Sequence, residues 1–347
     1  MAAFLSRPRL LCPPVAAYYI IIFDLGNRYG LLRSGGGPES AAAEGAALCR
    51  HKEGMEGPAR PAPMPERGDH SMEPKTAIQI DDVIIHLPKP TELPVQWVGQ
   101  EEVMKQVLAA WMVLDEADLP LNPRLIGKPG VGKTTLAYAA AKRSGRAVYL
   151  FQATMDTRPE DLVVTPVIGP HNDIQYIGSS VVAAAVNGGV CILDEGNRMS
   201  EKAWASLAPL LDVRRYLESL VAGVKIHAHP EFRFVTTMND DASTYDLPEY
   251  IHSRLQPQIY IDFPEEDEEK RILQANVPFA DREILAYVLG FLRRAHEARE
   301  RYTVRDGINV ARYAMKLMET ETVTSDRALD VAIRLILGEE ALPYAEP

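Results

Sequence analysis

Short apolar runs alternate with helical patterns from residue 98 to residue 261. Such alternation is typical of a parallel sheet covered by helices. Val103, Val107 and Trp111 recur at helical spacing and predict a helix before the first strand. We expect strands at Arg124–Ile126, Ala147–Phe151, Val190–Leu193, Phe232–Thr236 and Gln258–Ile261. The pattern therefore predicts the α/β fold class.

Two segments between the predicted strands favour β-hairpins. In Val163–Ile177, turn-forming residues at Gly169–Asp173 separate two runs of high strand propensity. Val221–His229, before the fourth strand, is the second candidate. The tip at residues 169–173 has no evident role in a core, so it is either a surface that faces a partner or an ordinary variable loop. Pro209 is expected to interrupt a helix that begins at Ser200.

The chain becomes purely helical after Pro264, because apolar side chains there recur at helical spacing. Thr303 is expected to cap a helix that reaches Leu317, and Ser325 one that ends near Gly338. The first apolar stripe consists of Ile284, Val288, Phe291 and Ala295. These patterns predict a small helical domain after the α/β domain.

We accordingly divide the chain into three parts. Residues 1–74 are rich in glycine and proline and lack an apolar period from Ser34 onward, so we expect a disordered extension or translated sequence upstream of the true start. Residues 75–264 form the predicted α/β domain, and residues 265–347 the helical one.

Charge and cysteine content narrow the class of protein. The formal net charge is −11, and residues 1–74 carry eight basic and eight acidic residues, so the negative excess lies on residues 75–347. This excess argues against binding to duplex DNA, which relies on a basic face. Three cysteines without a C-x-x-C pair indicate a reducing, cytoplasmic location. The apolar stretch Leu10–Phe23 is shorter than the roughly 20 residues that span a bilayer, so no membrane span is expected.

The segment Gly127–Thr134 matches the phosphate-binding pattern G-x-x-x-x-G-K-[ST] in full, between a predicted strand and a strong helix former. In such a loop the backbone N–H groups turn toward phosphates, Lys133 pairs with β and γ oxygens, and the Thr134 hydroxyl binds Mg²⁺. The predicted nucleotide-binding residues are Gly127, Lys128, Pro129, Gly130, Val131, Gly132, Lys133, Thr134 and Thr135.

Polar side chains end two of the later strands. Asp194 and Glu195 follow an apolar strand, and successive strand residues point to opposite sides, so the two acids can take different roles. We expect Asp194 to hold Mg²⁺ and Glu195 to orient the attacking water. Asn239, at the end of the next strand, is expected to hold the same water or the γ-phosphate. An exposed Arg254 would be suited to supply charge across a subunit boundary.

The order of these motifs resembles the AAA+ ATPases, specifically the MoxR-like branch related to the McrB, dynein and midasin modules. The segments that carry the resemblance are Val98–Val103, the loop at 127–134, Gly188–Arg198, His229–Phe234, Thr237–Asn239 and Leu247–Leu255. The resemblance implies that Asn239 is the first sensor, Arg254 the arginine finger, and Arg305 the second sensor, with Arg312 as the alternative. It also implies ATP and Mg²⁺ as cofactors.

The resemblance further implies hexameric rings that remodel partner proteins, often alongside a von Willebrand A domain protein in trans. The chain departs from the family at Gly196, where a bulkier apolar residue is more usual, and at Pro209. Three alternatives stay open: a small-molecule kinase built on the same loop, a nucleotide-locked scaffold that needs no hydrolysis, and a preference for GTP over ATP.

Overall fold

The computed structural model describes residues 73–95, 97–240, 247–320 and 323–345. The predicted disordered extension therefore lies outside the described residues, apart from Glu73 and Pro74, which are exposed. Within the described residues, every helix is too short or too polar to span a bilayer.

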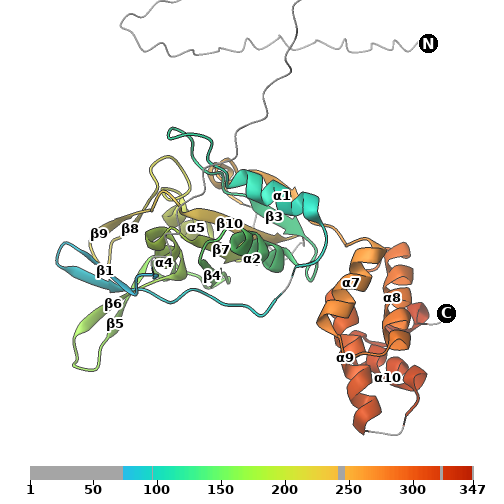
Figure 1. Ribbon diagram of the computed structural model, residues 1–347. Coiled ribbons are helices and arrows are strands. Elements are labelled where there is room, and N and C mark those ends of the chain that lie inside the picture. The colour runs from blue at the N-terminus through green and yellow to red at the C-terminus, as the bar shows by residue number, and fades with distance from the viewer. Residues whose placement is uncertain (1–72, 96, 241–246, 321–322, 346–347) are drawn as a thin grey trace, which may run out of the picture. The chain divides into compact units, whose positions relative to one another are not determined.

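A five-stranded parallel sheet forms the centre of the α/β part, with the strand order β11-β3-β10-β7-β4 (Figure 1). Its strands are β3 (Arg124–Gly127), β4 (Val148–Gln152), β7 (Val190–Asp194), β10 (Arg233–Asn239) and β11 (Gln258–Tyr260). All five predicted strands are present, so the α/β fold class is confirmed. The carboxyl ends of parallel strands share one edge of a sheet, and this edge gathers the ends of β3, β7 and β10.

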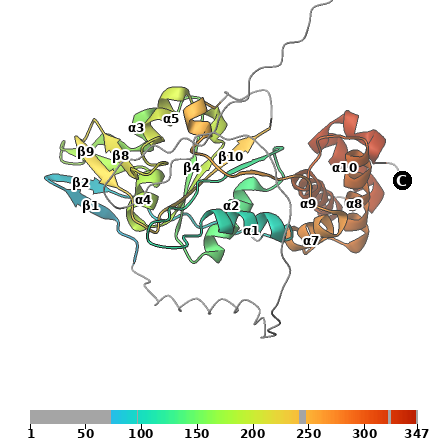
Figure 2. The same ribbon diagram turned by 90° about the horizontal axis from the view of Figure 1, so that it is seen from above.

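Helices cover both faces of the sheet. In Figures 1 and 2, α1 and α2 lie side by side, and α2 packs on β3, β10 and β7. On the other face, α4 packs on β4 and β7. The bounds are α1 (Glu101–Ala110), α2 (Lys133–Arg143), α3 (Pro159–Leu162), α4 (Ser180–Asn187), α5 (Glu201–Leu207) and α6 (Glu249–His252). A short 3-10 turn, η1 (Gly196–Arg198), lies between β7 and α5, and α5 ends before Pro209 as predicted.

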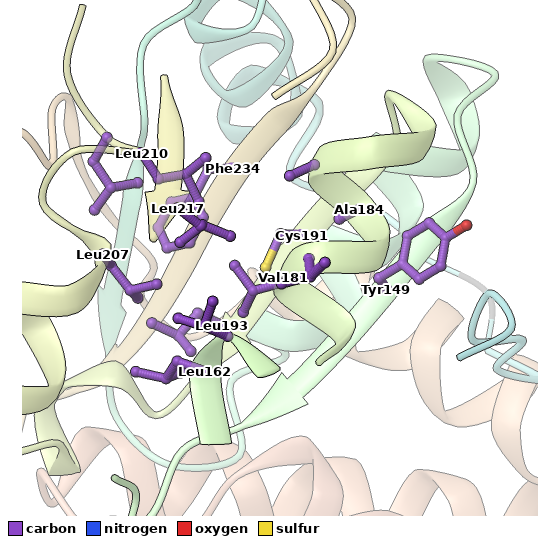
Figure 3. Packing of buried hydrophobic residues seen from close by; sticks show 14 of the residues in the cluster. Tyr149, Leu162, Val181, Ala184, Cys191, Leu193, Leu207, Leu210, Leu217 and Phe234 are labelled. Carbon is purple, nitrogen blue, oxygen red and sulfur yellow. The ribbon is translucent and has the colours of Figure 1, made fainter. Parts of the chain in front are cut away.

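Strand β7 shows how the sequence pattern builds the two layers. Val190 and Ile192 belong to the core beneath α1 and α2, whereas Cys191 and Leu193 belong to the core beneath α4 and α5. All four side chains are fully buried, as expected for a strand covered on both faces. Figure 3 shows Cys191 and Leu193 packed among Val181, Ala184 and Phe234. Burial raises the pKa of the Cys191 thiol, which fits a packing residue rather than a reactive thiol.

A second, four-stranded sheet has the order β1-β2-β6-β5. Its strands are β1 (Ala77–Ile80), β2 (Val83–His86), β5 (Val164–Ile168) and β6 (Ile174–Gly178). The antiparallel pair β5–β6 confirms the first predicted hairpin. Strands β1 and β2 were not predicted from the sequence.

The second predicted hairpin is present but was placed too late in the chain. Its strands are β8 (Tyr216–Ser219) and β9 (Val224–His227), so the expected range Val221–His229 holds only the turn and the second strand. The first strand was missed because Tyr216–Ser219 contains only two apolar residues, too few to give a periodic signal.

The helical part from residue 266 onward has a core of its own. Its helices are α7 (Glu266–Asn276), α8 (Arg282–Glu297), α9 (Val304–Thr320) and α10 (Ser325–Leu337), followed by the 3-10 turn η2 (Glu339–Tyr344). The buried residues of α8 include the whole predicted stripe of four. Ser325 is the first residue of α10 rather than its cap, because Thr324 holds the cap position and the Ser325 hydroxyl faces Glu283 instead.

Candidate nucleotide-binding site

The phosphate loop joins β3 to α2, as the motif requires. Gly130 and Gly132 have φ angles of +89° and +96°, in the left-handed region that favours glycine. A Cβ atom on Gly130 would lie 2.6 Å from the Thr303 hydroxyl, so the loop leaves no room for a side chain there. Lys133 is buried, and its Nζ donates to the carbonyl oxygens of Gly127 and Lys128, each at 2.8 Å. Its ammonium group is thus held over the loop.

Asp194 lies against the start of α2. The Thr134 hydroxyl donates to Asp194 Oδ1 over 2.6 Å, and the Thr237 hydroxyl donates to the same oxygen. The two residues predicted to bind Mg²⁺ are therefore adjacent, although they lie 60 positions apart in the sequence. Mg²⁺ takes oxygen ligands and is commonly bound by one or two protein oxygens together with phosphates and water. A hydroxyl and a carboxylate beside a phosphate loop fit that chemistry.

Glu195 leaves the strand instead of continuing its alternation. Its φ is +56°, and its backbone N–H donates to the Thr237 hydroxyl at 2.9 Å. Glu195 therefore lies in a left-handed turn directly after the strand, which ends at Asp194. Non-glycine residues with positive φ are uncommon and often occur at functional sites.

The carboxylate of Glu195 contacts three polar side chains. Asn239 Nδ2 donates to Oε1 at 3.2 Å, Gln152 Nε2 donates to Oε2 at 3.3 Å, and Arg198 Nε lies 2.6 Å from Oε2. The structure thus brings the predicted pair Glu195 and Asn239 together. Three polar residues around the two acids were not predicted from the sequence: Gln152, Arg198 and Thr237. For two of them the position in the sequence could have indicated a place near the site. Gln152 directly follows a predicted strand, and Thr237 lies two residues before Asn239.

A cavity of about 250 Å³ adjoins the loop, and its mixed apolar and polar lining would suit a nucleotide base. Its walls come from both parts of the chain and include Val95, Trp97, Gly130, Gly132, Thr135, Phe263, Ile308, Arg305 and Arg312. Both arginines proposed for the second sensor therefore line this cavity. Arg312 also donates to the Asn276 carbonyl oxygen at 3.1 Å, so it is tethered to α7. The choice between the two arginines stays a prediction.

Arg254 has a different set of contacts. Its Nε and Nη2 lie 3.2 Å and 3.1 Å from Asp212 Oδ2, and its Nη1 donates to the Tyr250 carbonyl oxygen at 2.6 Å. Hydrogen bonds from Arg214 first, and then from Arg254, hold the pKa of the Asp212 carboxyl well below its usual range. Among the contacts of the described residues, none joins the Arg254 side chain to the phosphate loop or to Asp194 and Glu195 of its own chain.

Comparison with known proteins places this site in a family. The family described as "AAA domain (dynein-related subfamily)" matches residues 124–255. An uncharacterized protein of Staphylococcus epidermidis is 25% identical over 175 residues, which is 49% of this chain and 66% of that protein, just under two thirds. Protein NorQ of Paracoccus denitrificans is 28% identical over 235 residues (65% of this chain, 82% of NorQ). Protein MoxR of Methylorubrum extorquens is 27% identical over 176 residues (49% and 50%).

Among solved structures, the RuvB Holliday junction branch migration motor of Thermotoga maritima aligns with a TM-score of 0.48 at 16% identity and covers 69% of this chain and 70% of RuvB. The family match spans the phosphate loop, both acids and Asn239, and its last residue is Leu255, directly after Arg254. Residues 124–255 therefore form an AAA domain with a phosphate loop, and the chain is similar to the NorQ and MoxR proteins.

Proposed function

We propose that the protein is a Mg²⁺-dependent ATPase that acts in the cytoplasm as a ring, most simply a hexamer, and uses ATP hydrolysis to remodel a partner protein. The observation that carries the proposal is the arrangement at the carboxyl edge of the sheet. There Asp194 meets Thr134, and Glu195 meets Asn239, beside a complete phosphate loop. A site that only bound nucleotide would have no use for the second pair.

Each residue has a role that follows from its position. Bound Mg²⁺ would neutralise phosphate charge, with Thr134 and Asp194 as its protein ligands. The Lys133 ammonium group would exchange its carbonyl partners for β and γ oxygens. The Glu195 carboxylate would accept a hydrogen bond from the attacking water and polarise it, and Asn239 would fix the orientation of that carboxylate and water.

Substitution of Glu195 tests hydrolysis directly. We expect Glu195→Gln to bind ATP as the natural chain does but to release phosphate roughly 100-fold more slowly or worse, because general-base assistance is lost. Lys133→Ala should lose ATP binding itself. Glu218→Gln, an exposed carboxylate on β8, is the matched control. Phosphate release by the natural chain without any added acceptor would separate this function from a small-molecule kinase. A partner-dependent function that survives Glu195→Gln would instead favour the nucleotide-locked scaffold.

Arg254 completes the site of a neighbouring subunit in this proposal. Its side-chain hydrogen bonds within its own chain go to Asp212 and to the Tyr250 carbonyl oxygen, and Asp212 holds the guanidinium in a fixed orientation. A mixture of Arg254→Ala and Lys133→Ala chains tests the idea, because an intact loop and an intact arginine meet only at mixed interfaces. We expect each variant alone to be inactive and the mixture to recover activity. No recovery at any mixing ratio would contradict a shared site.

We further propose that the β5–β6 hairpin faces the client or a von Willebrand A domain partner in trans. Ile168 and Ile174, on either side of the turn, are 78% and 68% exposed, which is unusual for isoleucine and gives the tip an apolar surface. Deletion of residues 169–173 should abolish stimulation of the ATPase rate by the partner and leave the basal rate unchanged. Retention of both would remove the hairpin from the mechanism.

A further inference from the structure

The segment between α1 and β3 combines apolar and acidic side chains on one surface. Residues 112–121 contain three acidic residues, Asp115, Glu116 and Asp118, and no basic residue. Leu114 is 80% exposed, and the other large apolar side chains of the segment that are exposed are Met112, Leu119 and Leu121. A leucine this exposed, flanked by carboxylates, is typical of a contact surface rather than of a core.

Hydrogen bonds hold this segment in one shape. Leu121 N–H donates to the Ala110 carbonyl oxygen at 2.8 Å and closes the loop at its base. Asp118 Oδ2 accepts from Leu114 N–H at 2.9 Å, and Asp115 Oδ1 accepts from the N–H of residue 117 at 2.8 Å. Leu114 therefore stands on a preordered loop, and docking would cost little conformational entropy.

The helical part carries a groove of the opposite character. Helices α7 and α8 pack against each other (Figure 1). Residues of both helices line a cavity of about 620 Å³. Leucine side chains and cations line it: Leu273, Leu285, Leu289, Lys270, Arg282 and Arg293. Glu266 is the single carboxylate among its lining residues. The groove thus combines apolar walls with a net positive rim, which matches the apolar and acidic surface of residues 112–121.

The end of the acidic segment lies next to the backbone of Arg254. Asn122, directly after the segment, donates through Nδ2 to the Arg254 carbonyl oxygen at 3.2 Å and to the Leu211 carbonyl oxygen at 3.0 Å. If Arg254 reaches toward the nucleotide site of a neighbouring copy, residues 112–121 approach that same neighbour. Leu114 is 80% exposed in its own chain, so the α7–α8 groove of that chain does not cover it.

From these observations we infer that residues 112–121 of one copy dock in the α7–α8 groove of the next copy. Leu114 enters between Leu285 and Leu289, and the acidic side chains face Arg282 and Lys270. The inference rests on the proposed ring, to which it adds a specific contact between neighbours. The apolar part of the contact supplies affinity, and the charge pattern selects the partner surface.

Replacement of Leu114 tests the apolar half. Burial of a leucine side chain corresponds to roughly a tenfold to hundredfold change in association. We expect Leu114→Asp to weaken assembly by that factor, measured by sedimentation with Mg²⁺ and a non-hydrolysable ATP analogue. Leu335→Asp, at a leucine of α10 that is 65% exposed, is the matched control and should assemble as the natural chain does.

Exchange of charges tests the electrostatic part of the proposed contact. Glu116 is the suitable acid, because Asp115 and Asp118 also bind backbone N–H groups of the loop. Glu116→Lys and Arg282→Glu should each weaken assembly severalfold, and the chain that carries both should regain most of it. Equal assembly of all three variants, or a double variant weaker than either single one, would overturn the assigned contact.

A disulfide between chains reports the contact without relying on affinity. Leu114→Cys and Leu289→Cys chains, each with Cys12 and Cys49 replaced by serine, should cross-link when mixed and oxidised, whereas Leu114→Cys with Leu335→Cys should not. Normal assembly of Leu114→Asp without a cross-link would overturn the docking and leave the ring intact. A natural chain that stays monomeric with the ATP analogue would overturn both.

Discussion

Glu269 offers a test of the electrostatics of the helical part. Its side chain lies on α7 and is 2% exposed, and its Oε1 is 3.6 Å from His296 Nδ1 on α8. Burial first, and the charge of Glu266 on the same helix second, raise the pKa of the Glu269 carboxyl from its ordinary value of 4.5 to about 7. His296 in turn stacks on Phe263 with ring centroids 4.2 Å apart.

The sign of the pH effect follows from this shift. Between pH 4.5 and pH 7 the folded chain keeps a proton on Glu269 that the unfolded chain has released, so the free energy of unfolding falls as the pH rises through this window. A shift of this size corresponds to about 3 kcal/mol at most. Below pH 4.5 both states are protonated, and this contribution is constant.

Urea unfolding followed by circular dichroism at several pH values from 5 to 8 would measure the effect. We expect the free energy of unfolding of Glu269→Gln to depend less on pH than that of the natural chain. At pH 8 the variant should be more stable than the natural chain by up to about 3 kcal/mol. Glu319→Gln, an exposed carboxylate on α9, should follow the natural curve. If the free energy of unfolding of the natural chain and of Glu269→Gln changed with pH in parallel, the reasoning would be refuted.

Three further substitutions test the α/β part. Gly196→Ala would bring a Cβ within 2.3 Å of the Thr236 hydroxyl, so we expect a loss of about 1–3 kcal/mol in thermal or urea unfolding. Thr237→Val keeps the shape but removes the hydrogen bonds to both acids, and should lower the phosphate release rate while costing about 1–3 kcal/mol of stability. Asp212→Asn should slow ATP hydrolysis severalfold with unchanged ATP affinity, because Arg254 loses its orienting carboxylate.

The central sheet was predictable because its strands are buried on both faces. Runs such as Val190–Leu193 are continuously apolar, and a Gly-rich loop followed by a helix former fixes the polarity of the first strand. The second sheet was not predictable in the same way. Ala77–Ile80 and Val83–His86 are four residues each and largely exposed or half-buried, so a single-sequence pattern has little apolar period to detect.

The residues of the candidate site that belong to a local motif could be predicted. The residues that reach the site only through tertiary contacts were harder to predict. The phosphate loop and Asp194 follow from local sequence. The contacts of Gln152 and Thr237 instead depend on the register of strands, since Gln152 is paired with Asp194 across β4 and β7. Register between strands that lie tens of residues apart is set by packing, which the sequence of either strand alone does not encode.

The strand order also has a consequence for biosynthesis. Strand β3, which leads into the phosphate loop, pairs only with β10 and β11 in the five-stranded sheet, and both are encoded more than 100 residues later. A nascent chain that has emerged only as far as β7 therefore has a phosphate loop whose strand lacks any sheet neighbour. Nucleotide capture should begin late in translation, after Arg233–Asn239 has left the ribosome, and until then the unpaired edge of β7 is open to association with other chains.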